Sequence, residues 1–154
     1  MSFEEVSEAK NLLFSCVQRE AYPIEIRALS QGKLLQKGSP LNKLDPFLDG
    51  DGLLRIKGHL EYSDLCYESK HPLILPSTHI VKTLVRFQHR LLKHAGVSTL
   101  VTTLRNCYWI VQLRRLAKAV CRECVACRKQ DSRACNQPVA PLPELRVKSA
   151  PPLL

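Results

Sequence analysis

The chain has 154 residues, of which 45% are hydrophobic and 24% are charged, and its formal net charge is +9. This composition is typical of a folded protein, and the length excludes a large enzyme. No segment approaches the roughly 18 to 20 consecutive apolar residues of a membrane span, so we expect neither a transmembrane helix nor a signal peptide. Seven cysteines without a secretory signal are more typical of free thiols or metal ligands than of a disulfide framework.

The positive charge is concentrated in one part of the chain. Residues 71–135 carry twelve Lys and Arg against two acidic residues, whereas residues 1–70 carry nine basic and eleven acidic residues. A basic surface of this kind suits a phosphate backbone or another polyanion, although a solvated surface without a partner has the same composition. Nucleic acid is therefore the first candidate partner, and we expect no membrane and no small-molecule substrate.

The first part of the chain, 1–70, predicts a small α+β region. Residues 3–21 have apolar residues at helical spacing and acidic residues in the first turns, which predicts a helix that Pro23 ends. Residues 24–36 are compatible with a short helix or an extended segment. The turn residues at 49–52 and the apolar residues after them predict a turn, a short strand and a second strand of a hairpin.

Residues 71–131 predict a mainly helical domain. A short apolar strand, HPLILP, leads into a first helix whose end is expected near Gly96, because glycine favours helix termination. A second helix follows Ser98, and a third covers 111–124 with its apolar residues on one face. Three short helices in succession predict a bundle that needs stabilisation beyond its own core.

Two segments outside these helices carry separate predictions. Tyr108 and Trp109 lie between the second and third helices; the pair could stack on a nucleic-acid base, but we expect both rings to belong to the core of the domain. Residues 132–154 are rich in proline, which predicts a tail or linker.

Four residues of the helical domain have the types and the spacing of a zinc site. His89 and His94 lie five residues apart, and 29 residues separate His94 from Cys124, which forms CVAC with Cys127. At about 100° per residue, five helical residues place the two histidines roughly 140° apart, so they can share an ion only if the helix ends between them. Two imidazoles and two thiolates complete a tetrahedron without an open position, which predicts a structural zinc.

Other interpretations of the cysteines remain open. Cys121 could replace Cys124 in a shifted pair, although it fits better as a small buried residue. The run from Cys121 to Cys135 is spaced too widely for a ferredoxin-type iron–sulfur site. A thioredoxin-like redox pair would need a βαβ context, which the sequence does not show.

Residues 71–129, from HPLILP to CVACRK, resemble the HHCC zinc-binding domain at the N-terminus of retroelement integrases, particularly those of BEL/Pao retrotransposons. The likeness rests on HP.ILP, both histidines, the glycine after them, the YWI segment and CVAC. The upstream stretch LDPFLDGDGLLRIKGHL is similar to the junction between ribonuclease H and integrase, and QPVAPLPELRV to the linker before the catalytic core. The resemblance implies a helix-turn-helix-like three-helix bundle, contact with the element's terminal DNA, self-association, and one structural zinc held by His89, His94, Cys124 and Cys127.

The resemblance also bears on catalysis and DNA contact. In such integrases the carboxylates that hold two metal ions lie beyond the linker, and here only Glu144 follows Asp131. We therefore predict a non-catalytic, nucleic-acid-associated module, nuclear or cytoplasmic with the nucleus favoured, and a zinc-stabilised protein-interaction module as the alternative. Phosphate contacts are expected from basic residues on the first and third helices, namely Lys82, Arg86, Arg90, Lys93, Arg114, Arg115, Lys118 and Arg122.

Overall fold

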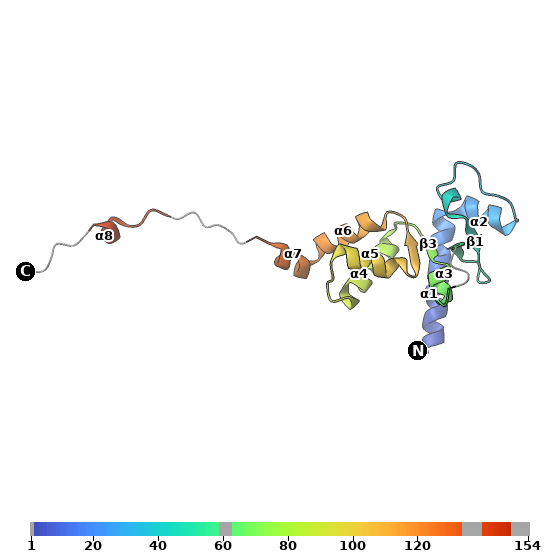
Figure 1. The fold of residues 1–154 in the computed structure, drawn as a ribbon, viewed down its shortest axis with the longest axis horizontal. Coiled ribbons are helices and arrows are strands. Elements are labelled where there is room, and N and C mark those ends of the chain that lie inside the picture. The colour runs from blue at the N-terminus through green and yellow to red at the C-terminus, as the bar shows by residue number, and fades with distance from the viewer. Residues whose placement is uncertain (1, 59–62, 134–139, 149–154) are drawn as a thin grey trace, which may run out of the picture.

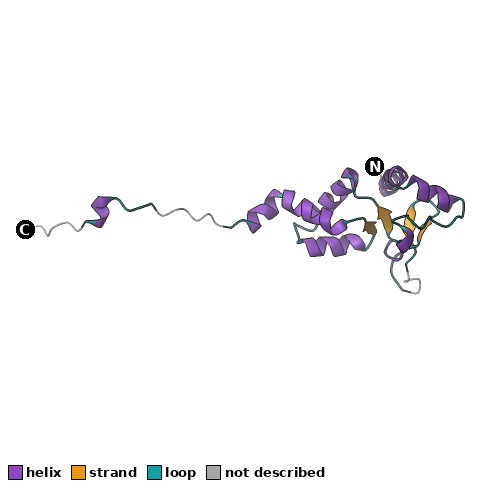
Figure 2. Cartoon of the chain, turned by 90° about the horizontal axis from the view of Figure 1, so that it is seen from above, coloured by secondary structure: helices purple, strands orange, loops and turns teal. Residues whose placement is uncertain are grey.

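The computed structural model describes residues 2–58, 63–133 and 140–148 (Figure 1). Most of this part of the chain is helical, and a small four-stranded sheet lies among the helices (Figure 2). The expectation of a mainly helical fold is confirmed. Across the described ranges, no helix has both the length and the apolar character needed to cross a membrane.

Two helices form the N-terminal part. The first, α1 (Phe3–Ala21), has the predicted bounds and begins with a capping box, in which Ser2 accepts a hydrogen bond from the first turn and Glu5 accepts one from the Ser2 N–H at 2.8 Å. The second, α2 (Pro23–Ser30), starts with proline, whose missing N–H has no partner at that position in any case. The ambiguous segment 24–36 is therefore helical as far as Ser30 and irregular after it, and a 3-10 turn, η1 (Asn42–Leu44), comes next.

The sheet has the strand order β1-β2-β3-β4. Strands β1 (Pro46–Leu48) and β2 (Leu54–Ile56) form an antiparallel hairpin, and β3 (Leu73–Leu75) pairs antiparallel with β2 and parallel with β4 (Tyr108–Ile110). The hairpin partner of β2 is thus β1, which lies before the turn at 49–52. The sequence predicted a partner strand after β2 instead, and that strand falls on 59–62, outside the described residues. The sequence predicts β3 but not β4.

Asp49 organises the turn between β1 and β2. One of its carboxylate oxygens accepts hydrogen bonds from the backbone N–H groups of Asp51 and Leu53, at 3.0 and 2.9 Å. The other pairs with the buried guanidinium of Arg55, which also donates to the carbonyl of His71 just before β3. The carboxylate therefore has a structural role in holding the hairpin against the next strand.

The helices of the second half pack around one another. Contacts connect every pair among α4 (His79–Leu91), α5 (Val97–Arg105) and α6 (Leu113–Glu123). The last of these, α6, also contacts the short helix α7 (Val125–Asp131). Of the tail expected at 132–154, the structure describes 132–133 and 140–148, where a single helical turn lies apart from the other elements in both views (Figures 1 and 2). The bounds are α3 (Tyr67–Lys70), α4 (His79–Leu91), α5 (Val97–Arg105), α6 (Leu113–Glu123), α7 (Val125–Asp131) and α8 (Glu144–Val147).

The sheet separates two hydrophobic clusters. Side chains alternate along a strand, so Leu73 and Leu75 of β3 belong to one cluster and Ile74 belongs to the other. The larger cluster joins β3 and β4 to α4, α5 and α6, and it also contains Phe14 and Val17 of α1. Residues from both sides of position 70 therefore share one core.

A buried glutamine connects α1 to two strands. The side-chain amide of Gln18 donates to the carbonyls of Leu54 and Ile74, at 2.9 and 2.7 Å, and accepts from the Leu54 N–H at 2.8 Å. The side chain is fully buried, so these three bonds satisfy backbone groups that water cannot reach. Gln18 thereby fixes β3, and with it the start of α4, relative to α1.

Candidate metal centre

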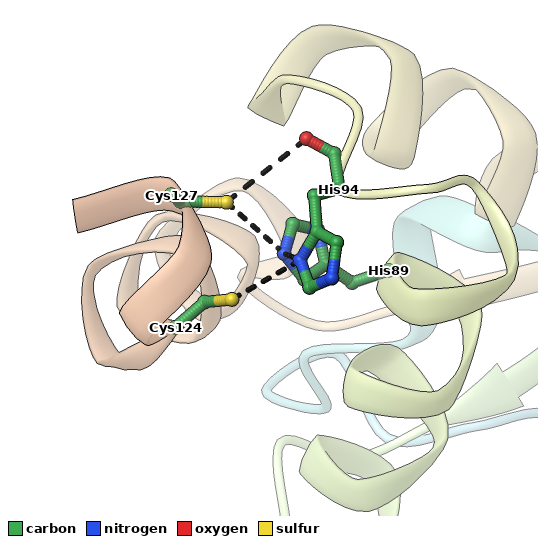
Figure 3. Close-up of side chains that lie close together, drawn as sticks. All are labelled: His89, His94, Cys124 and Cys127. Atoms are coloured by element: carbon green, nitrogen blue, oxygen red, sulfur yellow. Dashed lines mark hydrogen bonds between the residues drawn. The ribbon is translucent and has the colours of Figure 1, made fainter. Parts of the chain in front are cut away.

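The two histidines lie at the end of α4. His89 is buried in the last turn, and the helix ends at Leu91, between the histidines, as the spacing requires. The His94 N–H donates to the His89 carbonyl at 3.0 Å, and the Lys93 N–H donates to the Arg90 carbonyl at 3.0 Å. This pair of bonds is a Schellman motif. It turns the chain back, so that the two imidazoles approach each other (Figure 3).

The residues that make this turn differ from the expected one. Lys93 and His94 have φ values of 52° and 63°, the left-handed conformation that a Schellman motif needs. Gly96 is instead the N-cap of α5, with an extended backbone. The prediction that the helix ends between the histidines is confirmed, but the assignment of Gly96 as its terminator is wrong. A left-handed non-glycine residue costs about 1–3 kcal/mol and persists where the surrounding structure fixes it.

The two cysteines lie at the junction of α6 and α7. Cys124 separates the two helices, and Cys127 lies in the first turn of α7. Hydrogen bonds from the backbone N–H groups of Cys127 and Ala126 lower the pKa of the Cys124 thiol, whereas burial raises the pKa of the Cys127 thiol. Burial also lowers the pKa of His89, which favours the neutral imidazole that a metal ion requires.

The four donor atoms converge on one point (Figure 3). His94 Nδ1 lies 3.1 Å from His89 Nε2 and 3.1 Å from Cys124 Sγ, and Cys127 Sγ lies 3.3 Å from His89 Nε2. All four atoms lie within 4.8 Å of one another. A tetrahedral zinc with bonds of about 2.0–2.3 Å has donor separations of roughly 3.3–3.8 Å. The group could therefore hold a metal ion, and its nitrogen and sulfur donors suit zinc.

Cys121 is not part of this group. Its sulfur lies 4.0 Å from Nδ1 of His89, which is the ring nitrogen that does not face the other donors. Cys121 packs against the larger hydrophobic cluster, and burial raises the pKa of its thiol. The geometry thus favours Cys124 over Cys121 as the partner of Cys127.

The basic residues on α6 form an exposed row. Arg114, Lys118 and Arg122 recur every four residues along one flank of the helix, and Arg115 is exposed beside them. Leu113 and the other buried residues of α6 face the core. Within the described chain, no ion pair engages any of these four basic side chains.

The basic residues on α4 have different surroundings. Lys82 and Arg86 both pair with the carboxylate of Glu123 at the end of α6, at 2.6 Å each, and these hydrogen bonds lower the pKa of Glu123. Arg90 lies beside the donor group, and Lys93 lies in the Schellman turn. Glu123 is the residue after Arg122, so its side chain points about 100° away from that of Arg122 around the axis of α6. Lys82 and Arg86, which pair with Glu123, therefore lie to one side of the α6 row. DNA contact by these eight residues stays a prediction.

Tyr108 and Trp109 are neighbours on β4, and their rings lie on opposite faces of the sheet. The Tyr108 ring packs against Phe14 with the ring centroids 5.8 Å apart, whereas Trp109 is 39% exposed. The expectation of a core position is confirmed for Tyr108 and wrong for Trp109. The reason is that both rings lie on one strand, where neighbouring side chains point to opposite faces.

The second half of the chain is thus a helical region with a His2Cys2 donor group that could hold a metal ion. Residues 76–133 match the family model described as integrase zinc binding domain, and this segment contains all four donors. This part of the chain is therefore similar to integrase zinc-binding domains, and the matching model describes a zinc-binding rather than a catalytic domain. No curated protein and no solved structure matches the chain.

Proposed function

We propose that the chain is a non-catalytic module of a BEL/Pao-type retrotransposon integrase, which uses one structural zinc to hold its helices and contacts DNA phosphates through α6. The observation that carries the DNA contact is the exposed row of Arg114, Lys118 and Arg122, which has no ion-pair partner among the described residues. The resemblance of residues 71–129 to the integrase HHCC domain supports the BEL/Pao assignment.

The zinc would act on the structure rather than on a substrate. His89 and His94 come from the end of α4, and Cys124 and Cys127 come from the junction of α6 and α7, so a shared ion ties together elements that are distant in sequence. Four protein donors leave no open coordination position for water. The donors therefore fix the angle between α4 and α6, and with it the orientation of the basic row.

The basic row has the geometry of a phosphate-binding surface. Arg114 and Arg122 are eight residues apart, which corresponds to about 12 Å along the helix axis. In a helix-turn-helix-like arrangement of α5 and α6, the second helix is the one that approaches DNA. Contacts of this kind are independent of base sequence and sensitive to salt.

Removing two members of the row is expected to weaken duplex DNA binding. In a Lys118→Ala, Arg122→Ala variant, the slope of log K against log salt should decrease by about 1 for each lost phosphate contact. Fluorescence anisotropy titrations of a labelled duplex at several salt concentrations measure this slope. The matched control is Arg27→Ala, Lys37→Ala, which removes the same charge from exposed positions outside α6. Binding that ignores salt, or an equal loss in both variants, would contradict DNA contact through α6.

Replacing Glu123 tests the contribution of α4. Glu123→Gln removes the carboxylate that neutralises Lys82 and Arg86. If these cations lie close to DNA, the variant should bind a duplex more tightly at low salt, with a salt slope steeper by about 1–2. The same anisotropy titration measures the change, and an unchanged slope would exclude Lys82 and Arg86 from the DNA contact.

A second candidate function rests on the outer face of α4. Ile80, Phe87 and Leu91 recur on one side of this helix and are 38%, 59% and 56% exposed. Exposed apolar residues in such a row suit a protein interface, including self-association. A monomeric chain that binds duplex DNA would favour the first function, and a dimer that Phe87→Ser dissociates, without DNA binding, would favour the second.

A further inference from the structure

A cavity of about 710 Å³ opens beside β4, on a different part of the molecule from the donor group. It is bordered by the end of α1 and by η1 on one side, and by β4 and the start of α6 on the other. Its volume falls in the range of about 300–1,000 Å³ that is usual for ligand pockets. Tyr22, Leu41 and Lys43 line it from outside the segment 76–133 that matches the zinc-binding family.

The sheet explains why this cavity contains an exposed tryptophan. Ile74 of β3 faces the smaller cluster with Tyr22 and Leu41, and Trp109 is its register partner on β4. Ile110 belongs to the larger cluster, so alternation along β4 puts Trp109 on the side of Ile74. The N-terminal region buries Ile74 fully but leaves Trp109, on the edge strand, 39% exposed. An indole surface thus remains open next to a partly apolar wall.

Cations surround this surface. Lys43 of η1, Arg105 of α5 and Arg114 of α6 line the cavity, and its described lining residues include no acidic side chain. The Arg105 guanidinium lies 6.0 Å from the centre of the Trp109 ring, at the outer limit of a cation–π contact. The cavity therefore combines an aromatic platform with three positive charges from three different elements.

We propose that this cavity binds an unpaired nucleotide of a single-stranded nucleic acid, whose base stacks on Trp109 and whose phosphates contact Lys43, Arg105 and Arg114. A free phosphate would not use the indole, and an apolar peptide would not use three cations, whereas a nucleotide uses both. The inference rests on the proposed nucleic-acid function and extends it from duplex phosphates to an unpaired base. Arg114 also begins the α6 row, so a strand that follows the row reaches the cavity directly.

The chain offers a direct optical test, because Trp109 is its only tryptophan. The probe is an oligothymidylate of about 12 nucleotides, within the usual site sizes for single-strand binding, added to the full zinc-loaded chain. We expect the base to quench Trp109 emission. A strand of equal length and charge that carries only abasic sites should not quench it, and a blunt duplex should quench it less.

A substitution at the platform measures its contribution to affinity. Trp109→Ala should weaken oligothymidylate binding by about 5- to 150-fold, the usual effect of losing one stacked base, and leave the abasic strand unaffected. Trp109→Phe should retain part of the affinity. The matched control is Tyr67→Ala, which removes an exposed aromatic ring from α3, outside both the cavity and the apolar face of α4. Anisotropy of labelled strands gives the affinities, and zinc content with helix signal confirms that each variant is folded.

The outcomes separate this inference from the proposed function. If the chain binds duplex DNA with the expected salt slope but neither quenching nor affinity for oligothymidylate depends on Trp109, the inference is overturned and the proposed function stands. If Trp109-dependent binding persists in the Lys118→Ala, Arg122→Ala variant, the cavity is supported independently of the row. Binding to neither probe overturns both. A stronger Trp109-dependent signal with oligouridylate would support the cavity and identify RNA as the source of the nucleotide.

Discussion

Replacing His94 by alanine is expected to unfold the α4 to α7 region even in the presence of zinc. The substitution removes one of four donors, and the three helices that these donors connect are short. Structural zinc contributes about 10–16 kcal/mol in small metal-binding domains at neutral pH, which is comparable to the whole stability of an ordinary domain. Thermal melts followed by far-ultraviolet circular dichroism, with zinc and with a chelator, measure the loss.

Matched variants separate the donor role from a general effect of the substitution. His79→Ala makes the same chemical change as His94→Ala at an exposed position at the start of α4. A second donor variant, Cys124→Ser, is expected to have the same effect as His94→Ala, and its control is Cys66→Ser at an exposed position. We expect both controls to melt like the wild type and to lose helix signal only on chelation. If His94→Ala melts like His79→Ala, or if the chelator changes nothing, the stabilising role of the donor group is refuted.

The second large effect is expected at Gln18. Gln18→Leu keeps the size of the side chain but removes three hydrogen bonds to the backbone of Leu54 and Ile74. A buried polar group without a partner costs about 1–3 kcal/mol, so the free energy of unfolding should fall by about 3 kcal/mol or more. Urea unfolding of the zinc-loaded chain measures the change.

The control for this experiment is Gln36→Leu, at an exposed position in a loop. A surface substitution of this kind usually changes stability by no more than about 0.5 kcal/mol. If Gln18→Leu proves as mild as the control, Gln18 does not hold α1 to the sheet. If the loss is large, the N-terminal region and the zinc-binding region are coupled through β2 and β3.

The four donor residues could be predicted from the sequence, because their residue types indicate zinc and their spacing is compatible with only one position of the helix end. His89 and His94 can share an ion only if a helix ends between them, and the structure places that end at Leu91. The residues that form the turn at the helix end could not be predicted. Lys93 and His94 adopt a left-handed conformation that local propensity assigns to glycine, so tertiary contacts determine it.

Features that depend on pairing between distant segments were missed for the same reason. Strand β4 is three residues long and exists only because it pairs with β3, and the exposure of Trp109 follows from that pairing. Glutamine in a helix usually faces water, so nothing in the local pattern of α1 marks Gln18 as a bridge to strands 36 and 56 residues away. The pairing of Glu123 with Lys82 likewise needs α4 and α6 in place.

The zinc content of the purified chain, measured per polypeptide by native mass spectrometry, tests the central claim most directly. The wild type and His79→Ala should each carry one zinc, and a His89→Ala, His94→Ala variant should carry none. Zinc retained by the double variant would contradict the His2Cys2 site and would indicate that cysteines alone hold the metal.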